Sequence, residues 1–227
     1  GDDDSLSTVN AVNGKKPVFF GLDAKNDFYA KNIKNSGDGK VLATLCFDNN
    51  NIDVEIPAIG TYMVTNALAA AAAGKLLGLT DEEIANGVAS YKTVGSRANV
   101  INTGKIKIID DCYNANPTSV RASLDTLSNL DGRKVAILGD MKELGSEELK
   151  LHFDTGVYAK LKDIGTVITV GELAKELAKG ADGKAFDTIE DAKPEILKTI
   201  KSGDVVLVKA SHSMQFENIV EFLKQNF

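Results

Sequence analysis

Polar residues that could bind a ligand or take part in catalysis gather in the stretch Asp110-Asp-Cys-Tyr-Asn-Ala-Asn-Pro117. It directly follows the isoleucine-rich run at residues 106–109, which is typical of a buried strand. Helix capping accounts for Asn116 and the proline after it, but not for the two aspartates, Tyr113 or Asn114. A carboxylate in such a place can accept the hydroxyl hydrogens of a sugar. This stretch is therefore the strongest local indication of a binding site.

Two further polar stretches follow apolar runs in the same way. The first, Gly139-Asp-Met-Lys-Glu-Leu-Gly145, is a glycine-bounded loop that could also be a plain connection. The second, Lys209-Ala-Ser-His-Ser213, holds two cations and two hydroxyls. His212 beside Lys209 would help to bind a carboxylate, although a loop histidine is more often an ordinary surface residue. His152 lies inside a predicted helix, and we interpret it as structural.

Arg97 and Asn66 are candidates because of where they lie. Arg97, in Gly95-Ser-Arg97, falls near a predicted domain junction, where its planar guanidinium could clamp a phosphate. The alternative is a solvated surface arginine. Asn66 lies in an alanine-rich helix that follows Gly60, and its amide could both donate to and accept from an adenine edge. Packing alone would explain that helix, but not the amide.

The elements that must position these residues alternate strictly after residue 91. Strands are predicted at 106–109, 135–138, 167–170 and 205–208, and helices at 117–130, 147–161, 172–179, 195–201 and 214–224. Parallel strands need crossover helices, so this rhythm predicts a doubly wound α/β domain. Ligands bind such sheets outside the carboxyl ends of the strands. We therefore expect the loops at 110–116, 139–145 and 209–213 to form the site.

The first part of the chain has a different pattern. Short β-prone runs at 17–20, 28–33, 41–47 and 52–56 alternate with turn clusters, which indicates antiparallel strands. A helix is predicted at 62–77, and a second one opens at Thr80, where Glu83 completes a capping box. This α+β part should end near residues 95–100, so we expect domains at 1–96 and 97–227.

Composition excludes several classes of function. The 26 Lys and Arg residues against 32 Asp and Glu give a net charge of -6, which argues against a nucleic-acid partner. The longest apolar run, at 67–74, is far shorter than the roughly 20 residues of a membrane span. Two distant cysteines suggest neither disulfides nor a zinc site, so we expect a reducing cytoplasm.

Taken in this order, the motifs resemble the central and C-terminal domains of the Mur ligase family. A Gly-x-His-Asn-x-x-Asn-Ala-x-Ala helix of that family is similar to residues 60–70, with Tyr62 and Met63 in place of the histidine and asparagine. The stretches Asp-Cys-Tyr-Asn-Ala-Asn-Pro-Thr-Ser and Leu-Gly-Asp-Met-x-Glu-Leu-Gly resemble the member that adds D-alanyl-D-alanine. Residues 209–214 resemble a Lys-Gly-Ser-Arg-x-Met pattern with Ala210 and His212 substituted, and residues 2–4 are similar to an Asn-x-Asp-Asp stretch.

The resemblance implies part of a central ATP-binding P-loop domain at 1–96, followed by a Rossmann-like ligase domain at 97–227. It implies amide formation through an acyl phosphate, with ATP, Mg²⁺, UDP-N-acetylmuramoyl-tripeptide and D-alanyl-D-alanine, and it implies no metal ligand in this chain. Asn66 would contact adenine, Asp111 the ribose and Arg97 the polyphosphate. Residues expected to line the nearby cleft are Tyr113, Asn114 and Asn116. Residues expected to hold the dipeptide are Asp140, Lys142, Glu143, Lys209, Ser211 and His212.

The sequence contains no phosphate-binding loop of the form Gly-x-x-x-x-Gly-Lys-Ser/Thr. Gly-Lys occurs five times, and the next residues are Lys16, Val41, Leu76, Ile106 and Ala185. We read Gly1 as an internal start, and expect the loop, a metal-binding carboxylate and a UDP-sugar-binding domain to precede it. The chain by itself should then be inactive.

The same fold could serve other functions. A nucleotide-dependent oxidoreductase on the same sheet would need a Gly-x-Gly-x-x-Gly turn, which the sequence lacks. Another Mur-type or folylpolyglutamate-type ligase is an alternative within the same chemistry. A binding module that has kept the fold and lost the chemistry is an alternative outside enzymology.

Overall fold

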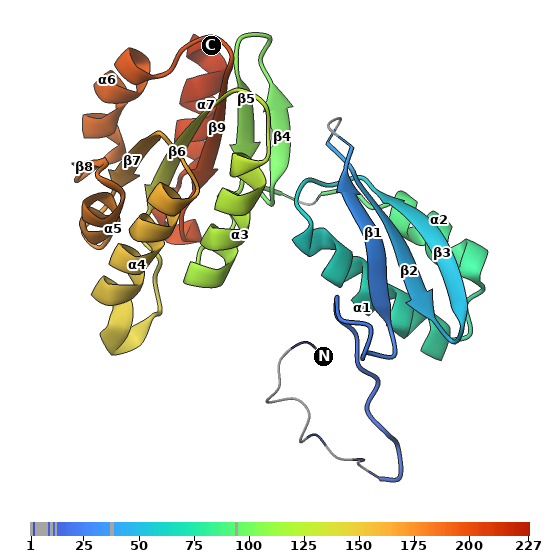
Figure 1. The fold of residues 1–227 in the computed structure, drawn as a ribbon. Coiled ribbons are helices and arrows are strands. Elements are labelled where there is room, and N and C mark those ends of the chain that lie inside the picture. The colour runs from blue at the N-terminus through green and yellow to red at the C-terminus, as the bar shows by residue number, and fades with distance from the viewer. Residues whose placement is uncertain (1, 3–8, 10, 12, 37–38, 94) are drawn as a thin grey trace. The chain divides into compact units, whose positions relative to one another are not determined.

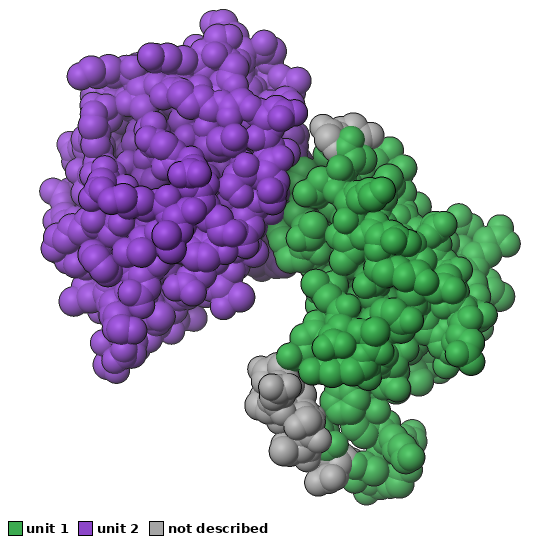
Figure 2. All heavy atoms as spheres, in the orientation of Figure 1, with its two compact units in different colours: residues 1–92 green, residues 93–227 purple. Residues whose placement is uncertain are grey.

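The chain folds as two units, residues 1–92 and 93–227, in a computed structural model that describes residues 2, 9, 11, 13–36, 39–93 and 95–227 (Figures 1 and 2). Of the acidic opening, only Asp2 is described, and Asp3 and Asp4 lie outside the described residues. The Asp2 carboxylate accepts hydrogen bonds from the backbone N–H groups of Leu22 (2.6 Å) and Asp23 (3.1 Å).

The first unit contains the antiparallel sheet that the turn clusters predict. Its order is β1 (Tyr29–Asn35), β2 (Val41–Phe47) and β3 (Asn50–Ile56), and both pairings are antiparallel. The predicted strand at 17–20 is wrong, because that segment makes only an isolated bridge between Phe20 and Phe28. The N–H of Phe19 donates instead to the Asp27 carboxylate, so the backbone here belongs to a loop.

Two helices cover one face of this sheet. Helix α1 (Tyr62–Leu76) follows Gly60, which has a φ of 92° that suits glycine, and its alanines let it lie close to the strands. Helix α2 (Asp81–Ala89) begins with the predicted capping box. The Glu83 N–H donates to the Thr80 hydroxyl at 3.2 Å, and the Thr80 N–H donates to the Glu83 carboxylate at 2.8 Å.

The second unit is built on a six-stranded sheet with the order β4-β5-β9-β6-β7-β8. Its strands are β4 (Asn99–Asn102), β5 (Lys107–Asp110), β6 (Arg133–Gly139), β7 (Thr166–Val170), β8 (Lys184–Phe186) and β9 (Asp204–Lys209). All neighbours are parallel except β4, which pairs with β5 antiparallel. The predicted α/β class is confirmed, whereas the short edge strands β4 and β8 were not predicted.

Helices cover both faces of this sheet (Figure 1). They are α3 (Pro117–Ser128), α4 (Glu148–Leu161), α5 (Ala174–Ala181), α6 (Ile189–Thr199) and α7 (Glu217–Asn226). Helices α6 and α7 share a buried cluster with Val135 and Ile137 of β6, while α3 contacts β6 and β9 and, with α4 and α5, covers the other face. Among the helices in the described part of the chain, none combines the length and apolar character that a membrane span requires.

The sheet order decides where the polar loops meet. Strand β9 lies between β5 and β6, and all three run in the same direction. Their carboxyl ends therefore share one edge, so the loops that follow them are neighbours despite being far apart in the sequence.

Candidate functional site

Hydrogen bonds tie the three polar loops of the second unit together. The N–H of Asp111 donates to the Val208 carbonyl at 3.0 Å, and the N–H of Ser211 donates to the Asp140 carbonyl at 3.1 Å. The Ser211 hydroxyl accepts from the Lys142 N–H at 2.9 Å. The structure thus brings the three predicted loops to one place at the edge of the sheet.

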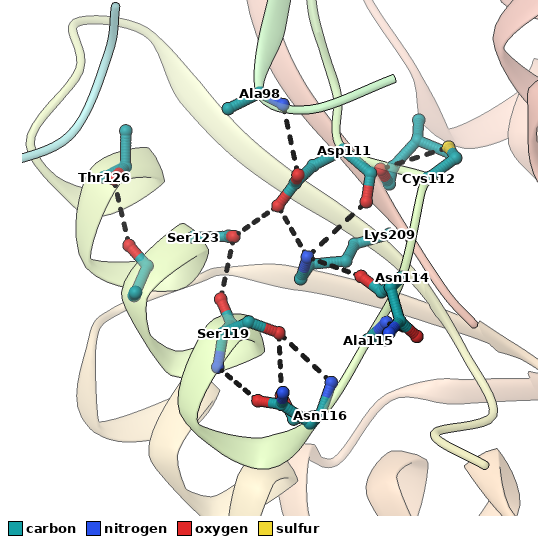
Figure 3. A network of polar contacts seen from close by, with 12 residues as sticks. Ala98, Asp111, Cys112, Asn114, Ala115, Asn116, Ser119, Ser123, Thr126 and Lys209 are labelled. Atoms are coloured by element: carbon teal, nitrogen blue, oxygen red, sulfur yellow. Dashed lines mark hydrogen bonds and ion pairs between the residues drawn. The ribbon is translucent and has the colours of Figure 1, made fainter. Parts of the chain in front are cut away.

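A buried ion pair forms the centre of this region (Figure 3). The Lys209 ammonium lies 2.6 Å from Oδ2 of Asp111 and 2.9 Å from the Asn114 carbonyl oxygen, and the Lys209 side chain is only 3% exposed. The same Oδ2 accepts the Ser123 hydroxyl at 2.7 Å, and Oδ1 accepts the Ala98 N–H at 3.1 Å. Both groups are therefore satisfied within the protein.

These contacts bear on the roles predicted for Asp111 and Lys209. A ribose hydroxyl at Asp111 would have to share the carboxylate with Ala98 or Ser123, and a ligand carboxylate at Lys209 would have to compete with Asp111. Both roles stay predictions. Ser123 was not predicted from the sequence. The signal that could have revealed it is a serine on the same buried helix face as Val120 and Leu124.

An aromatic cluster lies on the surface of the same region. The Arg97 guanidinium carbon is 3.7 Å from the centroid of the Tyr113 ring, and the His212 ring centroid is 5.9 Å from that of Tyr113. Tyr113 is 48% exposed, and Arg97 and His212 are exposed as well. The cluster is therefore accessible to an anion from solvent. In the absence of a ligand, the Arg97 guanidinium makes a cation–π contact with the Tyr113 ring.

The two asparagines of this loop make local backbone contacts. Asn116 caps α3, since its side chain accepts the Ser119 N–H at 2.8 Å and the Ser119 hydroxyl accepts the Asn116 N–H at 3.1 Å. The Asn114 side-chain oxygen accepts the Ala115 N–H at 2.8 Å. Both side chains are exposed, so contact with a ligand stays a prediction for each.

In the loop after β6, Asp140 is buried and the other two candidates are exposed. The Asp140 carboxylate accepts the Ala174 N–H (2.8 Å) at the start of α5 and the Lys142 ammonium (2.7 Å). Glu143 is exposed with a φ of 65°, a conformation uncommon for a residue with a side chain. Buried His152 supports the loop, because its Nε2 accepts the Met141 N–H at 2.9 Å and its Nδ1 lies 2.7 Å from the Glu148 carbonyl. Contact of the three loop residues with a dipeptide stays a prediction.

Cys112 is not a nucleophile in this setting. Its thiol is almost fully buried, and burial together with the negative charge of Asp110 raises the pKa of the thiol far above its ordinary value. The thiol therefore stays protonated, and it lies 3.4 Å from the Val208 carbonyl. Oδ1 of Asp110 is buried and has no hydrogen-bond partner within the described residues.

Asn66 lies in the first unit and lines a cavity of about 450 Å³. The other lining residues are Ile56, Met63, Ala67, Ala70, Leu79, Glu83, Ile84, Gly87, Val88 and Tyr91. The wall is mostly apolar. Of its polar side chains, the Asn66 amide donates to the Met63 sulfur at 3.4 Å, and the Glu83 carboxylate accepts from Thr80. The Thr80 backbone N–H lowers the pKa of the Glu83 carboxyl, so this group is ionised at neutral pH. Such a cavity suits a flat apolar group with a polar edge.

No three metal-ligating side chains come together among the residues that the structure describes. The groups gathered at the edge of the sheet are suited to binding and orienting ligands through hydrogen bonds and charge.

Comparison with known families and proteins places these features in context. Residues 1–74 match the family described as Mur ligase middle domain, and residues 96–212 match Mur ligase, glutamate ligase domain. The UDP-N-acetylmuramoyl-tripeptide–D-alanyl-D-alanine ligase of Bacillus subtilis is 34% identical and aligns with 90% of this chain and 46% of its own length. The Escherichia coli ligase of the same name is 32% identical, with 99% and 51% covered.

Solved structures agree. MurF from Acinetobacter baumannii has a TM-score of 0.84 at 30% identity, covering 91% of this chain and 46% of its own. MurF from Thermotoga maritima in complex with ADP has a TM-score of 0.85 at 26% identity, covering 99% and 52%. The chain spans about half the length of the curated relatives it matches. With both of its units matched by the family's domains, the chain belongs to the Mur ligase family.

Proposed function

We propose that this chain is the middle and C-terminal part of an ATP-dependent ligase that joins D-alanyl-D-alanine to UDP-N-acetylmuramoyl-tripeptide. The observation that carries the proposal is the meeting of two long motifs at one edge of the sheet. The loop after β5 carries Asp111 to Asn116, the loop after β6 carries Asp140 to Glu143, and Ser211 bridges toward the second loop. Relatives at about 30% identity bear the name of that ligase.

The proposed reaction follows from the substrates. A carboxylate is a poor electrophile, so the terminal phosphoryl group of ATP is first transferred to the tripeptide carboxylate. The dipeptide amine then attacks the acyl carbon, the carbon–oxygen bond to phosphate breaks, and an amide and inorganic phosphate result. What the protein supplies is orientation and charge stabilisation rather than a covalent nucleophile.

Each unit is assigned its own part. In the first unit, Asn66 and the apolar cavity beside it would bind adenine, with the amide at the polar edge of the base. In the second unit, Arg97 would contact the polyphosphate and Asp111 the ribose, while Tyr113, Asn114 and Asn116 would line the cleft. The exposure of Arg97 and of Tyr113 supports these roles. The dipeptide would be held by Asp140, Lys142, Glu143, Ser211 and His212, while Lys209 would act through its pair with Asp111.

The phosphate and magnesium machinery is not assigned to this chain. The sequence has no Gly-Lys-Ser/Thr loop, and no three metal ligands meet among the described residues. Mg²⁺ belongs to the proposal for the whole protein only. Both cysteines are free, which suits the reducing cytoplasm where we propose that the protein acts.

The acceptor in the ligation reaction tests this proposal. The whole protein, supplied with ATP, Mg²⁺ and UDP-N-acetylmuramoyl-tripeptide, should form the amide product with D-alanyl-D-alanine and none with L-glutamate. Mass spectrometry identifies the product. An enzyme that extended a substrate with glutamate would be a folylpolyglutamate-type ligase and would overturn the assignment.

The 227-residue chain by itself should release no phosphate from ATP above background in the same assay. The Gly-x-x-x-x-Gly-Lys-Ser/Thr loop, whose lysine and hydroxyl would contact the phosphates and Mg²⁺, is missing from its sequence. Steady turnover by the purified chain would contradict the division of labour proposed here.

A further inference from the structure

Lys209 differs from the other site candidates because its buried ammonium is fully paired with acceptors inside the protein. It ends β9, in the middle of the sheet, and all three hydrogens of its ammonium have protein acceptors. These acceptors are Oδ2 of Asp111 at 2.6 Å, the Asn114 carbonyl at 2.9 Å and the Asp111 carbonyl at 3.5 Å. Every acceptor belongs to the loop after β5. The ammonium is therefore built to hold that loop rather than to face solvent.

Asp111 connects Lys209 to the segment that carries Arg97. Its Oδ2 faces Lys209 and the Ser123 hydroxyl, which leaves Oδ1 for the Ala98 N–H at 3.1 Å (Figure 3). Ala98 has a φ of 54°, a backbone conformation that residues with a side chain seldom adopt. The hydrogen bond to a charge-paired carboxylate stabilises this turn immediately after Arg97.

The other side of Arg97 is fixed by the same loop. The Ser96 carbonyl accepts the Tyr113 N–H at 2.9 Å, and the guanidinium lies against the Tyr113 ring at 3.7 Å. Arg97 is thus positioned by a hydrogen bond at the preceding residue Ser96, one at the following residue Ala98, and its own stacking contact. All three partners sit on the loop that Lys209 holds.

We propose that Lys209 is a positioning residue: through Asp111 it fixes the turn at Ala98 and so sets the direction of the Arg97 guanidinium. This role replaces direct contact between Lys209 and a ligand. Its consequence for catalysis rests on the proposed function, in which Arg97 meets the phosphates of ATP. The geometric part stands on the contacts alone.

The direct test uses nuclear magnetic resonance on the 227-residue chain. The chain has only three arginines, Arg97, Arg121 and Arg133, so their side-chain Nε–Hε signals are easily assigned. Tyr113→Leu defines the position of the Arg97 signal without the ring. Lys209→Met should move the Arg97 signal most of the way to that position and should also shift the Ala98 amide. The signal of Arg133, which pairs with Asp204 at 2.6 Å, should stay in place.

A matched control is offered by Lys142→Met. Lys142 also pairs with a buried aspartate, Asp140, at 2.7 Å, but among the described residues no hydrogen bond or ion pair joins that pair to Ala98. This variant should leave the Arg97 signal unmoved, and Lys209→Arg should restore part of the wild-type position. A folded Lys209→Met chain with an unmoved Arg97 signal overturns the inference.

Should Lys209→Met not fold, Ser123→Ala carries the test. It removes the hydrogen bond that the Ser123 hydroxyl donates to the same Oδ2 and keeps the charge pair, so the Ala98 amide should still shift. An unmoved Ala98 amide in that variant overturns the network. In the whole ligase, Lys209→Met should raise the KM for ATP more than the KM for D-alanyl-D-alanine, as Arg97→Lys should. A displaced Arg97 signal with an unchanged KM for ATP would leave the positioning role standing and refute the assignment of Arg97 to ATP.

Discussion

The buried charges of the second unit give Asp111 a structural role beside the ligand contact proposed for it. Asp111 pairs with Lys209, whose side chain is 3% exposed. A neutral residue in place of Asp111 would therefore leave the Lys209 ammonium unpaired in the protein interior. The pair need not make a large net contribution to stability, because desolvating both charges offsets much of their attraction. Removing one partner destabilises the protein more strongly, because the desolvation cost of the remaining charge is then no longer offset by attraction.

Asp111→Ala should therefore destabilise the second unit by about 3–5 kcal/mol, the usual range for removing one member of a buried pair. Urea unfolding of the 227-residue chain measures this. The double variant Asp111→Ala/Lys209→Met should recover part of the loss, because it removes the unpaired charge of Lys209 as well.

If Asp111 also binds the ribose, Asp111→Ala alone should raise the KM for ATP in the whole ligase by the factor that corresponds to about 1.5–3 kcal/mol. Lower stability with an unchanged KM would leave Asp111 with its structural role alone.

The residue scale also shows how far the sequence leads toward the site. Residue type and position after a strand were enough to select Asp111, Tyr113, Lys209 and His212, and the fold brings these residues together. Their pairing could not be predicted, because parallel strands place loops at one edge without stating which donor meets which acceptor. His152 is the same case: its helix was predicted, while its contact with the Met141 N–H depends on how that helix packs.

At the scale of elements, prediction succeeded where periodicity was long and failed where elements were short. The central strands were found because they are runs of buried apolar residues. Strand β4, with its mostly exposed residues, and three-residue β8 carry no such pattern and exist only because a neighbouring strand offers its edge. Helix α6 was placed too late in the chain, since Thr188 caps it and Pro194 lies within it without ending it.

The crossing of α4 and α5 gives an element-scale prediction. A Cβ added at Gly156 would lie 2.0 Å from the Leu177 carbonyl oxygen, and one at Gly180 would lie 2.3 Å from the Phe153 carbonyl oxygen. Gly156→Ala should push the helices apart and cost about 1–3 kcal/mol, as overpacking does. Urea unfolding of the second unit measures the loss.

The control for this substitution is Gly87→Ala, within α2. A Cβ there would meet nothing within 4 Å, so the same exchange should be neutral or stabilise the first unit by up to about 1 kcal/mol through helix propensity. If Gly156→Ala proved equally harmless, the close approach of α4 and α5 would not be a packing constraint.

At the scale of the whole molecule, the two units have separate cores. The buried apolar cluster of residues 28–88 contains no residue from beyond Lys92, and the cluster of residues 106–223 contains none from before Thr93. Each unit therefore carries its own source of hydrophobic stabilisation. The sequence predicted a change of rhythm after residue 91, because helix and strand alternation begins there. It could not predict that residues 96–98 are bound to the second unit, since that depends on Asp111 and Tyr113.

This binding leads to a prediction about where a protease separates the units. Trypsin can cut after Lys92 or after Arg97, and it needs an extended, unprotected segment. Residues 91–93 form no helix or strand and Lys92 is exposed, whereas Arg97 is stacked on Tyr113 and its neighbours are bonded to the loop after β5. Limited digestion should therefore yield a folded fragment beginning at Thr93 before any that begins at Ala98, as intact mass and N-terminal sequencing would show. Lys92→Gln should delay the separation, and Lys209→Met should expose the bond after Arg97. Early appearance of a fragment beginning at Ala98 from the wild-type chain would mean that the turn at Ala98 is not held as described.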